Sequence, residues 1–174
     1  MSLVRKQLIV VAGAVPAVIV VYLAARYAST LFGFAALPAD NVGARLAFAA
    51  HWLTVPGLTL LAGIWAAGNR RFIGDAIDGT RSPLRHSLEI NLRYNQNTLE
   101  QALLAAIAWI NLSVMLPQER LVLIPAAAIL FGFGRAMFWI GYLIYPTARA
   151  FGMVLTALPT IAAYVWLVGR ALNL

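Results

Sequence analysis

The amino-acid sequence predicts an all-α protein, an integral membrane helix bundle. Hydrophobic residues make up 62% of the 174 residues, charged residues make up only 11%, and the mean hydropathy is +0.82. Apolar stretches recur along the chain, and each is near or above the roughly 20 residues that cross a bilayer core. Every polar segment between them is short, so we expect one polytopic unit without a separate soluble domain.

Five segments have the length and composition of transmembrane helices. They cover approximately residues 8–27, 46–67, 88–116, 121–145 and 151–169. The first follows Arg5 and Lys6 and could also be a secretory signal peptide, because the small residues of "AARYAS" offer a cleavage point. We favour a retained membrane anchor, since the apolar run is long for a signal peptide and tolerates Pro16 as a kink.

The distribution of charge indicates an orientation. The one sizeable polar connection, residues 68–86, is rich in arginine, and the positive-inside rule places it in the cytoplasm together with the N-terminus. The C-terminus then lies on the opposite side. The formal charge of +7 is scattered along the chain, which argues against a nucleic-acid partner. The chain has no cysteine, so disulfides, thiolate metal ligands and a thiol nucleophile of its own are excluded.

Polar residues form a stripe on the third predicted span. In a helix, Glu89, Arg93, Asn97 and Glu100 share one face, because they are spaced by four, four and three residues. A charge at the centre of a membrane costs at least about 2.5 to 3.5 kcal/mol on insertion scales. We therefore expect this face to turn toward the interior of the bundle and to find partners there.

The depth of each residue in the membrane suggests a partner for Glu100. The turn "PQER" makes the third and fourth spans antiparallel neighbours. Glu100 lies about 24 Å below this turn and Arg135 about 22 Å below it, at about 1.5 Å per residue. The sequence therefore predicts a buried structural ion pair between Glu100 and Arg135, with or without direct contact to a ligand.

The fourth span and the turn after it add further polar residues to the same layer. Arg135, Trp139 and Tyr142 share a helix face, and Arg149 opens the fifth span after a tight turn. Gly132, Gly134 and Gly141 are expected to let a neighbouring backbone come close. Arginines with amide and phenol groups suit an anion bearing carboxylates, although Arg93 and Arg149 could instead reach lipid phosphates at the interface. The predicted lining of this pocket is Arg93, Asn97, Tyr142 and Arg149.

Other enzyme classes find little support in the sequence. His51 and His86 lie on different segments without a carboxylate cluster, so we predict no metal site. There is no glycine-rich phosphate loop and no plausible serine triad.

Two motifs resemble those of the family of membrane-associated proteins in eicosanoid and glutathione metabolism, MAPEG. The segment "EINLRYNQNTLE" fits the pattern E-x-x-x-R-x-x-x-N-x-x-E, and "GRAMFWIGYLIYPTARAFG" supplies an arginine, a tyrosine seven residues later, and a further arginine after a proline-containing turn. The resemblance covers roughly residues 51–170. It implies a MAPEG-like four-helix transmembrane domain over residues 46–174, preceded by an extra N-terminal transmembrane helix and connection over residues 1–45.

The resemblance implies a homotrimer with glutathione as cofactor, bound at the subunit interfaces. In that arrangement Arg149 is the catalytic residue and Arg135 holds Glu100, while Arg70 or Arg71 reaches the tripeptide from a neighbouring subunit. The implied glutathione-binding residues are Arg93, Asn97, Glu100, Tyr142 and Arg70.

The function implied is a membrane-bound glutathione-dependent transferase or peroxidase that acts on lipophilic electrophiles or hydroperoxides, in a bacterial inner membrane. The chain departs from many catalytic members at Asn95 and Gln96, where those members carry histidine and arginine. The alternative is therefore a non-catalytic MAPEG-like protein that binds lipid or a partner protein.

Overall fold

The computed structural model describes residues 2–33, 36–74, 77–79 and 86–173. These residues form α-helices and one short 3-10 helix, with no strand among them, and the all-α prediction is confirmed. The elements are α1 (Leu3–Arg26), α2 (Ala28–Phe32), α3 (Val42–Trp52), α4 (Thr54–Phe72), α5 (His86–Met115), η1 (Gln118–Arg120), α6 (Leu123–Ile144) and α7 (Ala150–Ala171).

Five helical segments among the described residues are long and apolar enough to cross a membrane, as the sequence predicts. The second span is a pair of helices, α3 and α4, which meet at Leu53 and together cover Val42–Phe72. The helices extend beyond the predicted limits mainly where polar residues are part of the helix or cap its first turn. Ser2 is one example, because its side chain accepts a hydrogen bond from the Arg5 amide and begins α1 five residues before the predicted start.

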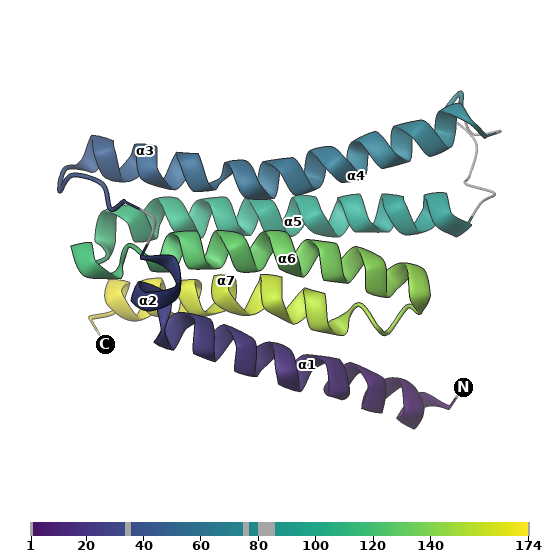
Figure 1. Ribbon diagram of the computed structural model, residues 1–174, viewed down its shortest axis with the longest axis horizontal. Helices are drawn as coiled ribbons and strands as arrows, with labels where there is room; N and C mark the ends of the chain where they lie inside the picture. Colours follow the sequence, from purple (N-terminus) through teal and green to yellow (C-terminus); the bar gives the residue numbers. More distant parts are fainter. Residues whose placement is uncertain (1, 34–35, 75–76, 80–85, 174) are drawn as a thin grey trace.

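The long helices lie side by side in the order α4, α5, α6, α7 and α1 (Figure 1). The N-terminus, the end of α4, the start of α5 and the α6–α7 turn lie at one end of the bundle, which we call the N-terminal end. The start of α3, η1 and the C-terminus lie at the opposite end. Successive spans therefore alternate in direction, as expected from the connections.

Helix α6 lies at the centre of the bundle and is the most buried span. It packs most extensively on α7, and two glycines make this close approach possible. A Cβ atom on Gly152 would overlap the backbone of Phe138 and Gly134, and a Cβ on Gly134 would lie 2.9 Å from the Gly152 carbonyl oxygen. The predicted role of Gly134 is thus confirmed. Gly132 differs, because its nearest neighbour is the side chain of Val55, not a backbone.

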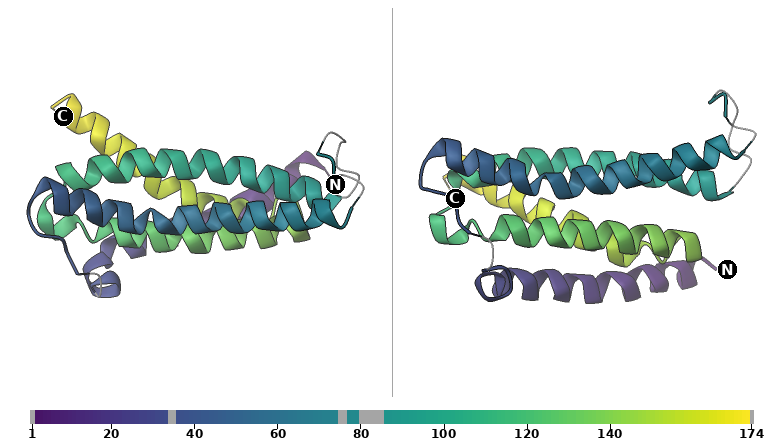
Figure 2. Two further views of the ribbon diagram at one scale, coloured as in Figure 1. Left: turned by 90° about the horizontal axis from the view of Figure 1, so that it is seen from above. Right: turned by 45° about the horizontal axis from the view of Figure 1, so that its top comes forward.

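Helix α1 packs on the outside of α7 and α6, on the side of the bundle away from α3 and α4 (Figures 1 and 2). Three small or branched residues on one of its faces, Ala17, Val21 and Ala24, are buried against Leu130 and Leu155. The rest of α1 is mostly exposed, as expected for a helix that faces lipid. Retention of this first helix stays a prediction.

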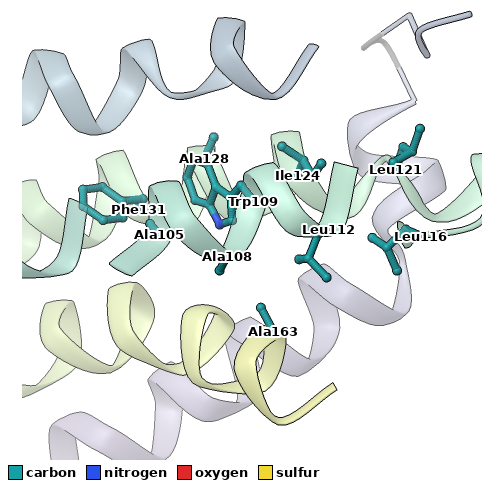
Figure 3. Close-up of a cluster of buried hydrophobic side chains, with 10 residues drawn as sticks. All are labelled: Ala105, Ala108, Trp109, Leu112, Leu116, Leu121, Ile124, Ala128, Phe131 and Ala163. Carbon is teal, nitrogen blue, oxygen red and sulfur yellow. The ribbon is translucent and has the colours of Figure 1, made fainter. Parts of the chain in front are cut away.

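The largest apolar cluster joins α5, α6 and α7 in the half of the bundle opposite the N-terminal end (Figure 3). Its centre is the buried Trp109, whose ring meets the ring of Phe131 edge to face, with centroids 6.3 Å apart. Ala105, Ala108 and Ala128 surround this contact and leave room for the two rings. The cluster fixes α5 against α6.

The buried side chain of Arg45 on α3 caps the C-terminal end of α5. The last carbonyls of a helix have no partner within it, and a guanidinium can supply several donors at once. Arg45 also pairs with the exposed carboxylate of Asp40 at 2.7 Å. The other acceptors of the Arg45 guanidinium are the carbonyl oxygens of Ser113, Val114 and Leu116 and the side chain of Gln118.

Candidate functional site

An open hollow of about 490 Å³ lies where the N-terminal half of α5 meets the end of α6 and the start of α7. The structure brings together here five residues that the sequence predicted for the site, although they come from three helices. Two residues outside that prediction, Leu92 and Gln96, complete the wall. The lining residues are Leu92, Arg93, Gln96, Asn97, Glu100, Tyr142 and Arg149.

Arg93 is held at the rim of the hollow by two hydrogen bonds. Its Nη2 donates to Oε1 of Glu89, one turn earlier on α5, at 2.6 Å. Its Nη1 donates to the hydroxyl oxygen of Tyr142 on α6 at 3.4 Å. Because the Tyr142 oxygen accepts this bond, its own O–H group remains able to donate to another acceptor.

Arg149 is the N-cap residue of α7, and its position depends on Gly141. A Cβ atom on Gly141 would lie 2.7 Å from the Ala148 carbonyl oxygen and 3.0 Å from the Arg149 nitrogen, so only glycine lets this turn lie against α6. The Arg149 guanidinium then lies 4.6 Å from the ring centroid of Tyr142 and 5.5 Å from that of Phe138. Within the described chain, no carboxylate pairs with Arg149.

Arg135 is fully buried behind this hollow, with 0% of its surface exposed. Its Nη1 donates to Oδ1 of Asn97 at 2.9 Å, and its guanidinium lies 4.1 Å from the ring centroid of Phe138. Its Nε and Nη2 atoms are buried without a hydrogen-bond partner. A buried cation with two open donors is costly unless an anion or further acceptors reach it.

The predicted ion pair between Glu100 and Arg135 does not form within the described chain. Glu100 is exposed, and its Oε1 accepts a hydrogen bond from Nε2 of Gln96 at 2.8 Å. Counting residues from the turn predicted that the two residues lie at the same level along their helices, but it did not predict the direction in which each side chain points around its helix axis. Asn97 precedes Glu100 by three residues, which rotates it by about 60° on the α5 surface and turns it toward Arg135.

Arg70 does not line the hollow. Its Nη1 donates to the Ser87 carbonyl oxygen and to Oδ1 of Asn91, on another face of α5. Asn91 is fully buried, and its Oδ1 also accepts a hydrogen bond from Nε1 of Trp139 at 2.9 Å. A contact between Arg70 and a neighbouring subunit's ligand therefore stays a proposal.

Sequence reasoning missed Asn91 and underestimated Gln96. Asn91 belongs to a second stripe on α5, with Tyr94 and Thr98 at helical spacing, and all three are buried. That spacing was available in the sequence as a signal. Asn95 turns the other way, toward α4, where Gly63 leaves the space that its side chain and the ring of Tyr94 occupy. Of the two departures from the catalytic motif, only Gln96 lines the hollow.

The surroundings of the hollow carry an excess of positive charge. The guanidinium groups of three arginines lie in or directly behind the hollow, against two carboxylates, and of these carboxylates only Glu89 forms an ion pair with a described residue, Arg93. The hollow thus combines guanidinium groups, two amides and a phenol with the single carboxylate of Glu100. Such a set of donors binds carboxylates or another anion.

Comparison with known proteins connects this arrangement to a family. The model of the MAPEG family matches residues 46–169 of the chain. Transmembrane protein 79 of Mus musculus is 33% identical over 82 residues, which are 47% of this chain and 21% of that protein. The chain thus covers only about a fifth of the length of this relative. No solved structure gives a significant match to the chain.

Proposed function

Because this chain belongs to the MAPEG family, we propose that it is a membrane-bound enzyme that uses glutathione as a transferase or a peroxidase. Its substrates in this proposal are lipophilic electrophiles or hydroperoxides that reach the site through the bilayer. The observation that carries the proposal is the excess of positive charge at one hollow, where Arg149 and Arg135 have no carboxylate partner within the described chain.

The residues of the hollow fit the chemistry of glutathione. The tripeptide carries two carboxylates, an ammonium group and a thiol. Arg93 and Arg149 can each donate two parallel hydrogen bonds to a carboxylate, and the exposed carboxylate of Glu100 suits the ammonium group. The open donors of Arg135 lie behind Asn97 and favour negative charge in the hollow from within the bundle.

Bound glutathione would supply a thiol whose thiolate form displaces a leaving group from an electrophile. With a second glutathione it would reduce a hydroperoxide to an alcohol and water, and the two thiols would be oxidised to glutathione disulfide. Arg149 would favour the thiolate because a guanidinium next to a thiol stabilises its charged form. Tyr142 would donate its O–H to the same sulfur, since its oxygen already accepts a hydrogen bond from Arg93. The aromatic rings of Phe138 and Tyr142 limit the directions that Arg149 can take.

Assembly into a homotrimer is part of the proposal. On α5, the exposed Arg93, Gln96 and Glu100 share a surface with apolar residues such as Leu103, which is 60% exposed. A carboxylate facing lipid is costly, so this surface is expected to meet another protein surface. Contact between copies of the chain along α5 would enclose the hollow and remove these polar groups from lipid.

The decisive experiment measures glutathione binding by the purified full-length protein in detergent. We expect glutathione to raise the unfolding temperature and to produce the ultraviolet absorbance band of a thiolate. An analogue with a methyl group in place of the thiol should stabilise the protein without producing the band. This comparison separates binding from activation of the thiol.

The matched variants are Arg149→Ala at the site and Arg170→Ala at the opposite end of the bundle. Arg149→Ala should lose the thiolate band and turnover of a lipophilic electrophile, whereas Arg170→Ala should behave like the unmodified protein. Absence of any glutathione-dependent stabilisation in the unmodified protein would refute the proposal and leave the non-catalytic alternative. Equal activity of Arg149→Ala and the unmodified protein would refute the role of Arg149.

A further inference from the structure

A second hollow lies far from the candidate site, at the end of the bundle opposite the N-terminal end. It is an apolar cavity of about 220 Å³ between α1, the last turns of α5, the first half of α6 and the second half of α7. An apolar cavity of about 150 Å³ is already large enough to hold benzene. This cavity can therefore accommodate part of an acyl chain.

Small residues and a helix-interior proline keep the cavity open. Ala127 on α6 and Ala162 on α7 line it where larger side chains would fill it, and Pro159 lies in its wall. Val21 and Ala25 of α1 form the remaining side. Because α1 precedes residue 46, where the match to the family begins, this cavity is a property of the added helix together with the family domain.

Arg120 is the charged residue among those that line the cavity. It belongs to η1, between the end of α5 and the start of α6, and so lies at the end of the bundle. Its side chain is exposed and makes no hydrogen bond or ion pair with any other described residue. A free guanidinium at the mouth of an apolar cavity is complementary to a molecule with an anionic head and an apolar tail.

We propose that this cavity binds a long-chain fatty acid, with the acyl chain between α1, α6 and α7 and the carboxylate on Arg120. The lining residues of α6 extend from Leu123 to Leu130, about 10 Å along the helix, which is parallel to the path of a lipid tail. Lipid tails are as apolar as the cavity, so entry of the tail alone gains little free energy. Selectivity therefore comes from the pair of carboxylate and guanidinium.

The experiment uses a fatty acid with bromine atoms on its chain, because bromine quenches tryptophan fluorescence at short range. Trp109 and Trp166 line the cavity, whereas Trp65 on α4 is 70% exposed and reports contact with bulk amphiphile. We expect saturable quenching when the brominated fatty acid is added to the delipidated full-length protein in detergent. Replacing both cavity tryptophans by phenylalanine should remove the saturable part.

Two variants test separately the binding of the acyl chain in the cavity and the binding of the carboxylate by Arg120. Ala127→Phe fills the cavity and should abolish saturable quenching, whereas Ile161→Phe adds the same ring on an exposed position of α7 and should not. Arg120→Gln should weaken binding of the brominated fatty acid on the order of tenfold, the effect of one lost charge-assisted hydrogen bond. The same variant should not change binding of the corresponding brominated alcohol, and Arg170→Gln should change neither.

Three results would overturn the proposal. The first is equal saturable quenching in Ala127→Phe and the unmodified protein. The second is equal affinity for the fatty acid and the alcohol in the unmodified protein. The third is equally strong saturable quenching by a phosphatidylcholine with brominated chains, which would show unselective entry of lipid tails. Because Arg120→Gln changes an exposed side chain, it tests the head group even if Ala127→Phe fails to fold.

Discussion

Arg135 of α6 donates a hydrogen bond from Nη1 to Oδ1 of Asn97 on α5 at 2.9 Å, and this bond links the core of the bundle to the candidate site. Asn97 lines the hollow, whereas Arg135 is fully buried behind it. The charge of Arg135 therefore acts on the hollow without contact to its surface. Because Nε and Nη2 of Arg135 are buried without hydrogen-bond partners, we expect the stability of the protein to depend on the remaining bond to Asn97.

Asn97→Leu should destabilise the protein by about 1.5 to 3 kcal/mol, because the buried guanidinium loses a hydrogen bond that nothing replaces. The measurement is the free energy of unfolding in detergent. The matched control is Asn111→Leu, since the Asn111 side chain is bonded only to the Ile107 carbonyl oxygen of its own helix. Similar losses in both variants would contradict the importance of the bond to Arg135.

Arg135→Met should have the opposite effect on the ligand-free protein. Replacing a buried, incompletely paired charge by an apolar side chain of similar length is often neutral or stabilising by about 1 to 4 kcal/mol. We therefore expect an unfolding temperature equal to or above that of the unmodified protein. Stabilisation by glutathione should decrease in the same variant, because the hollow loses a positive charge. A large loss of stability without ligand would show that Arg135 has a compensating partner.

Gly152→Ala should destabilise the protein by about 1 to 3 kcal/mol or more, because the added Cβ overlaps the backbone of α6 and must push the two helices apart. Gly169→Ala in the same helix is the control. A Cβ at Gly169 meets nothing within 4 Å, so this change should stabilise α7 by about 0.5 to 1 kcal/mol. Thermal unfolding distinguishes the two outcomes by their sign.

Arg45→Leu should cost on the order of 3 kcal/mol, since it leaves the final carbonyl oxygens of α5 buried without donors. Asp40→Asn should cost less than about 1 kcal/mol, because the Asp40 side chain is 76% exposed and the pair is accessible to solvent. Comparing the two free energies of unfolding separates helix capping from the ion pair. Equal losses would assign the stability to the ion pair.

Leu103→Cys should form disulfide-linked dimers under oxidising conditions if copies of the chain meet along α5. The natural chain has no cysteine, so the engineered thiol reports a single position. Ile161→Cys, on the exposed face of α7, is the control and should remain monomeric on a non-reducing gel. Cross-linking at Ile161 but not at Leu103 would place the subunit interface elsewhere.

Particular residues show how far the site could be predicted from the sequence. Helical spacing and depth were sufficient to bring Arg93, Asn97, Tyr142 and Arg149 to one hollow, because straight antiparallel helices keep residues of equal depth level. The same reasoning was wrong for the pairing of Glu100 with Arg135 within the described chain. Two residues on one helix face can still differ by about 60°, and only the packed structure decides which of them reaches the neighbouring helix.

The sequence by itself determined that five apolar segments become helices and that polar groups gather near one end of the bundle. Hydropathy and periodicity are local properties, and a backbone in lipid must satisfy its hydrogen bonds within each segment. The tertiary structure decided the rotation of each helix, the pairing of Arg135 with Asn97, the capping of α5 by Arg45, and the cavity beside α1. These depend on contacts between helices at glycines and small side chains, where shape in three dimensions selects the neighbour.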